Sequence, residues 1–363
     1  MTVEQCWQQV PGGSGTYIRE LLREYAGRAD VAVSGVSALH RHGARPPLGP
    51  EVPVRAVPLP RAALYETWSR WRVPRAGGPD DVVHATTWAV PGSRRPLVVT
   101  VHDLAFLHDP EHFTPRGVTF FRRGLAIARD EATAVVVPSS VTGADVVEAG
   151  FDPERVHVVP HGVRPATTVP QDLVAFRERF GLSRPYVLWA GTREPRKNLP
   201  TLVSAFEQLL AGGADLDLVL VGPDGWGSER SRLTGSTAGR VRLLGRVSDH
   251  DLQTAYAGAL VFCYPSLREG YGMPVTEAMA HGTPVVTSRD TATEEAAGGA
   301  AVLVDPRDVT DVARGLAAAV EPARQPALRA ASAHRAAQLS WSNSAQATID
   351  VLRWATERGP RRG

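Results

Sequence analysis

Short apolar runs, each separated from the next by a helix-length segment, recur along the chain and sharply limit its possible folds. In the first half they occupy 31–36, 81–85, 97–101, 134–138 and 156–160, and in the second half 186–191, 216–222, 240–245, 259–265, 284–288 and 300–305. Short apolar runs bounded by turn residues are typical of buried strands. Because parallel strands need long crossovers, usually helices, the alternation predicts an α/β fold with parallel sheets in two doubly wound halves.

The stretch 164–173 is rich in Pro and Thr and breaks both periodicities, so we interpret it as an interdomain linker. We expect domains at 1–168 and 169–342. A last helical segment within 343–363 lies beyond the strands of the second domain and can cross back onto the first.

Composition excludes several classes of protein. The chain has 363 residues, 43% of them hydrophobic, and a net charge of +2, which predicts a soluble globular protein with two cores and no nucleic-acid partner. Cys6 and Cys263 are too few for a disulfide framework, so the expected compartment is a reducing cytoplasm. No apolar stretch is long enough to span a bilayer and no signal peptide opens the chain, so any membrane contact, at the inner face, would be peripheral.

A single lysine, Lys197, stands among the 40 basic residues, in the string GTREPRKN (191–198). The string joins a predicted strand to a predicted helix, for which Asn198 is a natural N-cap. Ligands bind at the carboxyl ends of strands in open α/β sheets, and helix starts there favour phosphate. Arg193 and Lys197 therefore predict an anion site, in particular for a diphosphate. A surface lysine without function is the alternative.

The segment SLREGYGMPVTEAMAHGTPVV (266–286) places two carboxylates at different points of one ligand site. Pro274 suits the first turn of a helix, so Glu269 falls in the preceding loop and Glu277 on the helix. Gly270 and Gly272 leave backbone donors exposed. An acidic first turn that merely suits the helix dipole would explain Glu277 but not the glycine loop.

The string PGGSGTY (11–17) predicts a glycine-rich turn that leads into a helix. Gly12, Gly13 and Gly15 permit positive φ and let backbone N–H groups approach an anion closely. The spacing is not that of a dinucleotide-binding motif, and a tight turn without a ligand is the alternative.

His102 and Asp103 follow the apolar run 97–101, at the carboxyl edge of the first sheet, where they could face an interdomain cleft. His102 could bond a sugar hydroxyl or accept part of a developing charge, and Asp103 could orient it or act on an acceptor hydroxyl. Tyr17 is a further candidate for acceptor contact. A lone histidine is more often structural, which is the alternative.

Aromatic and basic residues mix in 63–78, which includes Trp68 and Trp71, and again in 113–129. Such mixtures can dock a lipid-linked acceptor at a membrane surface. Ordinary core aromatics with solvated arginines are the alternative, which we favour.

These motifs together resemble those of retaining glycosyltransferases of the GT-B fold, in the large family 4. EGYGMPVTE resembles the family's E-x7-E motif, GTREPRKN its Arg/Lys phosphate loop, and PGGSGTY its N-terminal glycine loop. The resemblance runs from about residue 10 to about residue 345 and implies two Rossmann-like, doubly wound domains facing a central cleft. Only MTVEQCWQQV precedes the glycine loop, so the first strand is short or the recorded start is late.

The resemblance also implies roles for individual residues. Glu269 would contact the donor sugar and Glu277 the ribose, while Arg193 and Lys197 would stabilise the leaving diphosphate. His102 would lie near the reacting sugar and act in catalysis together with Glu269, Arg193 and Lys197. Further donor contacts would come from the glycine loops and the loop near the base: Gly13, Gly15, Gly245, Val247, Gly270, Tyr271 and Gly272. Asp103 and Tyr17 would contact the acceptor.

The implied activity is retaining, metal-independent transfer of a hexosyl group, best interpreted as mannosyl from GDP-mannose, to a saccharide or lipid-linked hydroxyl. No cofactor is expected, and the two D-x-D strings, at 215–217 and 249–251, are interpreted as structural. A catalytically silent nucleotide-sugar-binding protein and a glucosyltransferase that uses a UDP-sugar remain alternatives. A sugar phosphorylase fits poorly, since the sole lysine lies in a phosphate loop.

Overall fold

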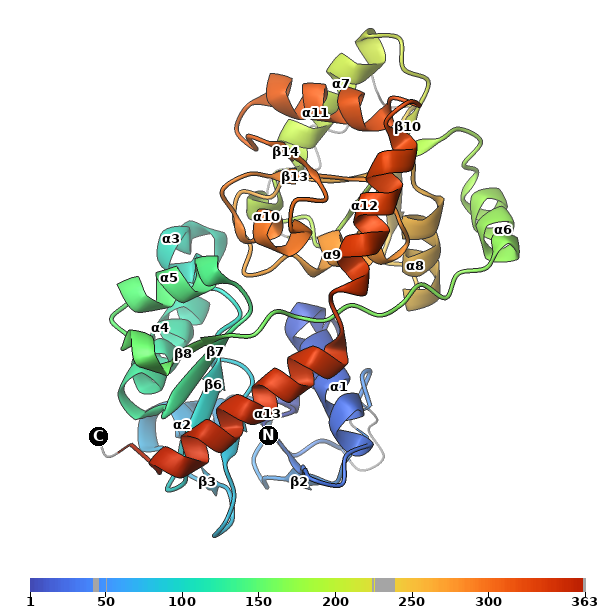
Figure 1. Cartoon of the computed structure of the whole chain (residues 1–363). Helices are drawn as coiled ribbons and strands as arrows, with labels where there is room; N and C mark the ends of the chain where they lie inside the picture. Colours follow the sequence, from blue (N-terminus) through green and yellow to red (C-terminus); the bar gives the residue numbers. More distant parts are fainter. Residues whose placement is uncertain (42–45, 50, 224, 226–238, 362–363) are drawn as a thin grey trace. The chain divides into compact units, whose positions relative to one another are not determined.

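The computed structural model describes residues 1–41, 46–49, 51–223, 225 and 239–361. The chain forms two compact units, each with its own core (Figure 1). The first unit comprises Met1–Gly162 and Trp341–Gly363, and the second comprises Val163–Ser340.

The second unit is built on a parallel sheet of six strands in the order β11-β10-β9-β12-β13-β14. The strands are β9 (Tyr186–Ala190), β10 (Asp217–Val221), β11 (Val241–Gly245), β12 (Val261–Tyr264), β13 (Val285–Ser288) and β14 (Val302–Val304). β9, β10, β12 and β13 are buried along their whole length, as expected for parallel strands covered on both faces. The strand order reverses between β9 and β12, which makes their carboxyl ends the topological switch point of this sheet.

Helices cover both faces of this sheet (Figure 1). On one face, α7 (Leu199–Ala211) packs against α11 (Val309–Val320), while α9 (Met273–Ala280) packs with α8 (Asp249–Gly258) and α12 (Gln325–Ala337) on the other. α6 (Pro170–Phe180) packs on α8, and the short α10 (Ala292–Ala297) packs on α9. The linker predicted at 164–173 therefore ends inside α6, which begins at Pro170.

The first unit contains three parallel sheets, two of which its first residues connect. Their strands are β1 (Gly35–Ser37) with β2 (Val54–Ala56), β3 (Arg75–Ala76) with β5 (Gly92–Ser93), and β4 (Val83–Ala85), β6 (Leu97–Thr100), β7 (Ala134–Val137) and β8 (Val156–Val158). Thr2 forms a parallel bridge with Val36 of β1, and its N–H donates to the carbonyl of His84 in β4 (2.9 Å). Where the sequence suggests a short first strand or a late recorded start, the structure has this single bridging residue.

The helices of the first unit are α1 (Gly12–Ala26), α2 (Arg61–Trp71), α3 (Ala105–His108), α4 (Pro115–Glu131), α5 (Ser140–Glu148) and α13 (Trp341–Arg358). α13 comes from the far end of the chain and packs on α1, β6 and β7. Val351 and Ala355 lie in the same apolar cluster as Val98 and Val136. Burial of these side chains is what fixes the C-terminal helix to this unit.

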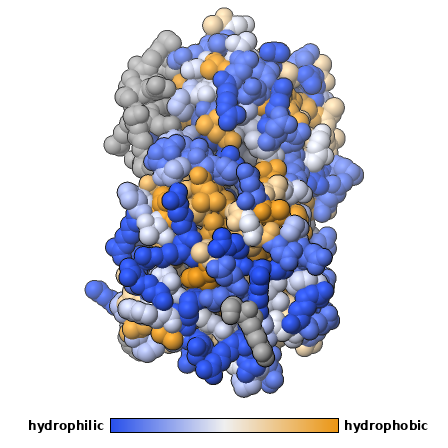
Figure 2. All heavy atoms as spheres, turned by 90° about the vertical axis from the view of Figure 1, so that its left-hand side faces the viewer, coloured by the Kyte–Doolittle hydropathy of each residue, from blue (hydrophilic) through white to orange (hydrophobic). Residues whose placement is uncertain are grey.

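Hydrophilic residues cover most of the face drawn in Figure 2. On the face in Figure 2, hydrophobic side chains reach the surface in patches separated by hydrophilic ones. Within the described ranges, no helix combines the length and the apolar character that crossing a bilayer requires.

Candidate active site

The loops that follow β9 and β12 meet because these two strands are neighbours at the switch point. The first loop ends in a short 3₁₀ helix (Pro195–Lys197), and the second carries Glu269. The ammonium of Lys197 donates to Glu269 Oε1 and to the hydroxyl of Tyr264 (2.5 Å). Arg196 Nη1 donates to the other carboxylate oxygen of Glu269 (2.8 Å). The predicted Lys197 and Glu269 thus lie in direct contact.

Glu269 is the centre of a hydrogen-bonded group that we call the Glu269 cluster: Arg196, Lys197, Tyr264, Ser266 and Glu269. Ser266 Oγ and the Tyr264 hydroxyl also donate to Glu269 Oε1, at 2.8 and 2.9 Å. Burial alone would raise the pKa of Glu269, but the charges of Arg196 and Lys197 lower it to about 2. The carboxylate is therefore ionised at neutral pH although it is buried.

The pKa of Lys197 is lowered by burial and by the neighbouring charge of Arg196, while Glu269 opposes that shift. A buried ammonium needs a paired anion to remain charged, and Glu269 supplies it. Lys197 can therefore stay charged in the folded chain, while Arg196 pairs with Glu194 (2.7 Å) as well as with Glu269.

Asn198 holds this loop in a way that the sequence does not predict. It precedes α7 in the left-handed region (φ 56°), and its side chain does not cap the helix. Its Nδ2 instead donates to the carbonyls of Pro265 (3.0 Å) and Pro306 (2.6 Å). The expected N-cap bond is thus absent, and the amide instead connects the loop after β9 to the loops after β12 and β14.

The glycine loop and Glu277 lie on the chain just after Glu269. Gly272 has φ 100° at the start of α9, and a Cβ there would lie 2.7 Å from the side chain of Thr293, so only glycine fits. Tyr271 is buried. Glu277 is half-buried on α9 and accepts a hydrogen bond from the Tyr256 hydroxyl (3.0 Å). One oxygen of Glu277 is therefore engaged by the protein itself.

The remaining candidates of the second unit lie at other points of the same sheet. Arg193 is half-buried in the loop after β9, and its N–H donates to the carbonyl of Pro223 (3.4 Å). Gly245 ends β11 with φ 66°, and its carbonyl accepts from the N–H of Gly222 (2.8 Å). Val247 packs against the core. Gly270 is buried in the loop after β12.

Three residues of the Glu269 cluster were missed by the sequence analysis: Arg196, Tyr264 and Ser266. Tyr264 is the last residue of β12, so a search for polar residues at strand ends would have found it. Arg196 directly precedes Lys197, and only the fold shows that it turns toward Glu269.

In the first unit, a cavity of about 290 Å³ is lined by His102, Asp103, Ser14 and other residues, and we call it the His102 cavity. His102 Nε2 lies 3.0 Å from the carbonyl oxygen of Thr86. Burial lowers the pKa of His102, so the ring is neutral at pH 7. Because a carbonyl only accepts, Nε2 carries the proton. The lone pair on Nδ1, which no described residue hydrogen-bonds, can accept from a ligand hydroxyl.

Other predicted residues of the first unit have mainly structural surroundings. Tyr17 is fully buried, its hydroxyl lies 3.1 Å from Thr100 Oγ1, and its ring packs edge-on against His102. It therefore has no surface for an acceptor, and that assignment is wrong. Asp103 Oδ1 accepts from the N–H of Ala105 (3.1 Å) beside α3.

The glycine turn begins α1 itself. Gly12 has φ 62°, Gly13 is exposed in the first helical turn, and Gly15 is buried. A Cβ at Gly15 would lie 2.3 Å from the Cβ of Pro11. Gly15 is therefore required for packing, whereas Gly13 leaves the helix start open to a ligand.

The two tryptophans considered for lipid contact differ in exposure. Trp68 is 1% exposed and donates its indole N–H to the carbonyl of Pro74 (2.9 Å), whereas Trp71 is 64% exposed. Trp68 is a core residue, as the favoured alternative predicts.

A metal site needs several His, Cys, Asp or Glu side chains close together. Among the described residues, one group brings three possible ligand atoms within 4.8 Å of one another: Asp109, Glu111 and His112. In the D-x-D strings, Asp215 pairs with Arg184 (3.0 Å) and Arg240 (2.6 Å), and Asp251 accepts from Ser248 beside α8. These aspartates have the protein partners expected of structural carboxylates.

Comparison with known proteins identifies the family. Residues 11–167 match the model for Glycosyltransferase Family 4, and residues 184–321 match that for Glycosyl transferases group 1. D-inositol 3-phosphate glycosyltransferase 1 of Catenulispora acidiphila is 32% identical over 344 residues, covering 86% of this chain and 81% of that protein. The chain belongs to glycosyltransferase family 4.

Further matches agree with this family. O-antigen chain mannosyltransferase B of Escherichia coli is 29% identical over 283 residues, covering 76% of this chain and 74% of that protein. The crystal structure of Anabaena Alr3699/HepE in complex with UDP and glucose has a TM-score of 0.72 at 21% identity, covering 94% of this chain and 96% of that one. This family 4 enzyme thus has the GT-B fold and transfers a sugar.

Proposed function

We propose that this glycosyltransferase moves a mannosyl group from GDP-mannose to a hydroxyl of a saccharide or lipid-linked glycan, with retention of configuration. The observation that carries the proposal is the Glu269 cluster, which holds a buried ammonium at the switch point of the second sheet. The mannosyl assignment is supported by the relative named as a mannosyltransferase.

Lys197 and Arg193 bind the diphosphate of the donor in this proposal. As the bond between the anomeric carbon and the phosphate oxygen breaks, negative charge develops on the leaving diphosphate. A fixed ammonium lowers the energy of that state more than the energy of the bound donor. Glu269 keeps Lys197 charged and in place, and its carboxylate can also accept a sugar hydroxyl.

Glu277, half-buried on α9, binds the ribose through its carboxylate in this proposal. The acceptor oxygen bonds to the anomeric carbon on the face that the diphosphate leaves, and its proton passes to a diphosphate oxygen. This route retains the configuration and needs neither a protein nucleophile nor a metal ion. The ring of His102 is neutral, and the lone pair on its Nδ1 accepts a hydrogen bond from a hydroxyl group of the sugar.

A donor panel tests the proposal. GDP-mannose, UDP-glucose and an ADP-sugar are each compared by thermal shift and by release of the nucleoside diphosphate with and without a glycan acceptor mixture. GDP-mannose should stabilise the chain most and be the donor consumed. A preference for UDP-glucose would replace the mannosyl assignment, and binding without any release would indicate a silent binding protein.

Variants test the residues. Lys197→Met and Glu277→Gln should lower kcat/KM, Lys197→Met by about 10²–10³-fold, the usual cost of one preorganised electrostatic contact. Arg324→Met, an exposed arginine of the same unit, is the matched control. Turnover near that of the unmodified chain in both variants contradicts the proposal. Proton NMR of the product reports whether the anomeric configuration is retained.

A further inference from the structure

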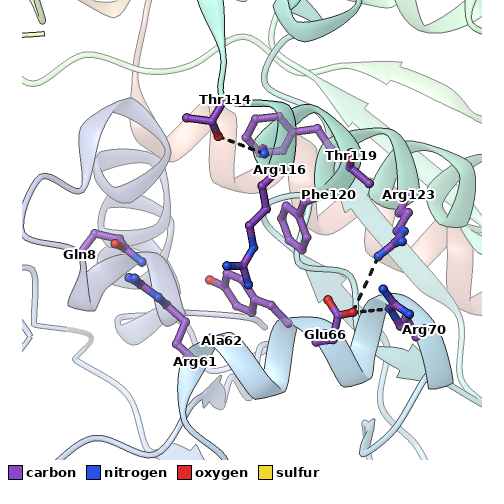
Figure 3. A pocket seen from close by; sticks show the side chains of 13 residues that line it. Gln8, Arg61, Ala62, Glu66, Arg70, Thr114, Arg116, Thr119, Phe120 and Arg123 are labelled. Carbon is purple, nitrogen blue, oxygen red and sulfur yellow. Dashed lines mark hydrogen bonds and ion pairs between the residues drawn. The ribbon is translucent and has the colours of Figure 1, made fainter. Parts of the chain in front are cut away.

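A second cavity of the first unit, about 760 Å³ in volume, lies between α2 and α4 (Figure 3). It adjoins the His102 cavity, since both are lined by Gln8, Tyr65, Phe120 and Phe121. We call it the arginine cavity because Arg61, Arg70, Arg116 and Arg123 line it. Nothing in the donor chemistry described above uses these four side chains.

The charge of the arginine cavity is unbalanced. Four arginines and one glutamate, Glu66, give its lining a net charge of +4 − 1 = +3. Glu66 pairs with both Arg70 and Arg123, the latter at 3.9 Å. Arg61 and Arg116 make no ion pair or hydrogen bond to any residue that the structure describes. Both side chains are exposed, so water solvates them, and an anion that enters the cavity meets two guanidinium groups that no described residue neutralises.

The two unpaired arginines project into the cavity from opposite walls. In Figure 3, Arg116 reaches from α4 toward α2, and Arg61 extends from the start of α2 toward Gln8. Glu66, Arg70 and Arg123 lie together at the other end of the cavity. The free positive charge is therefore concentrated at the end where Arg61 and Arg116 lie.

Both unpaired arginines also stand where a helix dipole disfavours a cation. Arg61 opens α2 and Arg116 is the second residue of α4, and neither first turn contains an acidic residue. Helix N-termini carry partial positive charge and normally favour Asp or Glu. The N-cap residue of α2 is Pro60, so no side chain caps that helix. The first turns of both helices thus contribute an arginine to the same cavity.

We propose that the arginine cavity binds a phosphate group carried by the acceptor, while an acceptor hydroxyl enters the adjoining His102 cavity. This inference rests on the proposed glycosyl transfer. Guanidinium groups bind phosphate and carboxylate with paired hydrogen bonds. A phosphate monoester carries about −1.5 to −2 charges at pH 7, which balances a +3 lining better than the single charge of a carboxylate.

The wall shared by the two cavities fits the part of the acceptor between its phosphate and its hydroxyl. The rings of Tyr65 and Phe120 stack with centroids 5.5 Å apart. Aromatic faces of this kind pack against the apolar face of a sugar or polyol ring. The acceptor class is therefore a phosphorylated sugar or polyol, either free in solution or as the headgroup of a phospholipid.

Calorimetric titration of the full chain with glycerol 3-phosphate, with glycerol and with inorganic phosphate tests the inference. The two phosphates should bind and glycerol should not, and binding should weaken as salt rises. Arg61→Ala and Arg116→Ala should each weaken phosphate binding about tenfold, the effect of one charged hydrogen bond. Arg122→Ala, exposed on the same helix but outside the cavity lining, is the matched control and should bind like the unmodified chain.

Equal phosphate binding by the unmodified chain and the Arg61→Ala/Arg116→Ala double variant overturns the inference, as does absence of phosphate binding. Flotation with phosphatidylcholine vesicles that contain phosphatidylinositol distinguishes the two sources. Flotation that the double variant loses indicates a lipid headgroup, and phosphate binding without flotation indicates a soluble acceptor. Nucleotide-sugar turnover is measured separately, so loss of phosphate binding with turnover intact rejects only this inference, whereas absent turnover rejects the proposed function.

Discussion

Lys197 in the second unit is buried beside Glu269, whereas Arg61 and Arg116 in the first unit line an open cavity without a partner among the described residues. A buried charge that lacks a partner is costly, so the pairing within the Glu269 cluster contributes to stability. An exposed arginine is solvated by water and needs no partner until a ligand arrives. We therefore expect substitutions in the Glu269 cluster to lower stability, and substitutions in the arginine cavity to change ligand binding with little effect on stability.

The two sites also differ in what a ligand meets when it enters. Under the proposed function, a donor diphosphate enters a site whose cation is already paired, so it shares Lys197 with Glu269. A phosphate that enters the arginine cavity displaces only water. We therefore expect the donor site to select ligands by their shape. Affinity at the arginine cavity should depend mainly on the charge of the ligand and on the salt concentration.

The largest expected effect is on stability in the second unit. Glu269→Ala leaves the buried Lys197 without its carboxylate, while Arg196 keeps Glu194, and should lower the free energy of unfolding by about 3–5 kcal/mol. Glu277→Ala removes one hydrogen bond from a half-buried group and should cost about 1 kcal/mol. Urea unfolding followed by circular dichroism measures both. Equal costs for the two variants would show that water enters the Glu269 cluster and that its pairing contributes little.

The second effect is a dependence of stability on pH. The folded pKa of Glu269, about 2, lies below its reference value of 4.5, so the carboxylate stabilises the fold above about pH 4.5. That contribution is lost as the pH falls through about 2, and the difference corresponds to about 3 kcal/mol. Urea unfolding of the unmodified chain and of Glu269→Gln between pH 5 and pH 2 should show two curves that converge as pH falls. Parallel curves contradict the shifted pKa.

Much of this comparison could be predicted from sequence, because it depends on local patterns. Strand runs and the motif spacing placed Lys197 and Glu269 in loops at the carboxyl ends of β9 and β12. Their contact then follows from strand order, which brings these two strands together. Three strands were not predicted from the sequence: β2, β3 and β5. Each has only two or three residues, and none lies in an apolar run.

What could not be predicted depends on side-chain direction and on contacts distant in sequence. Tyr17 lies on the apolar face of α1, yet only the packed structure shows that its hydroxyl meets Thr100 and has no access to an acceptor. The arginines of 113–129 were identified as solvated. Their convergence with Arg61 from α2 is a tertiary contact that no local periodicity encodes.

A smaller effect is expected from Tyr264→Phe. The Tyr264 hydroxyl accepts from Lys197 and donates to Glu269, so its removal takes two hydrogen bonds from the Glu269 cluster but leaves both charges paired. The free energy of unfolding should fall by about 1–2 kcal/mol. Turnover should fall less than in Lys197→Met, because the ammonium remains. A loss as large as that of Glu269→Ala would mean that the hydroxyl, and not the carboxylate, positions Lys197.

The smallest effect on stability belongs to the arginine cavity. Arg116→Ala removes an exposed cation from the positive end of α4, so the free energy of unfolding should change by no more than about 0.5 kcal/mol, and in the stabilising direction. Phosphate should raise the melting temperature of the unmodified chain by binding only the folded state, and it should do so much less in the Arg61→Ala/Arg116→Ala double variant. Thermal unfolding with and without phosphate measures both quantities. A destabilised Arg116→Ala that responds normally to phosphate would mean that Arg116 serves the fold, as Lys197 does, and would remove the contrast between the two sites.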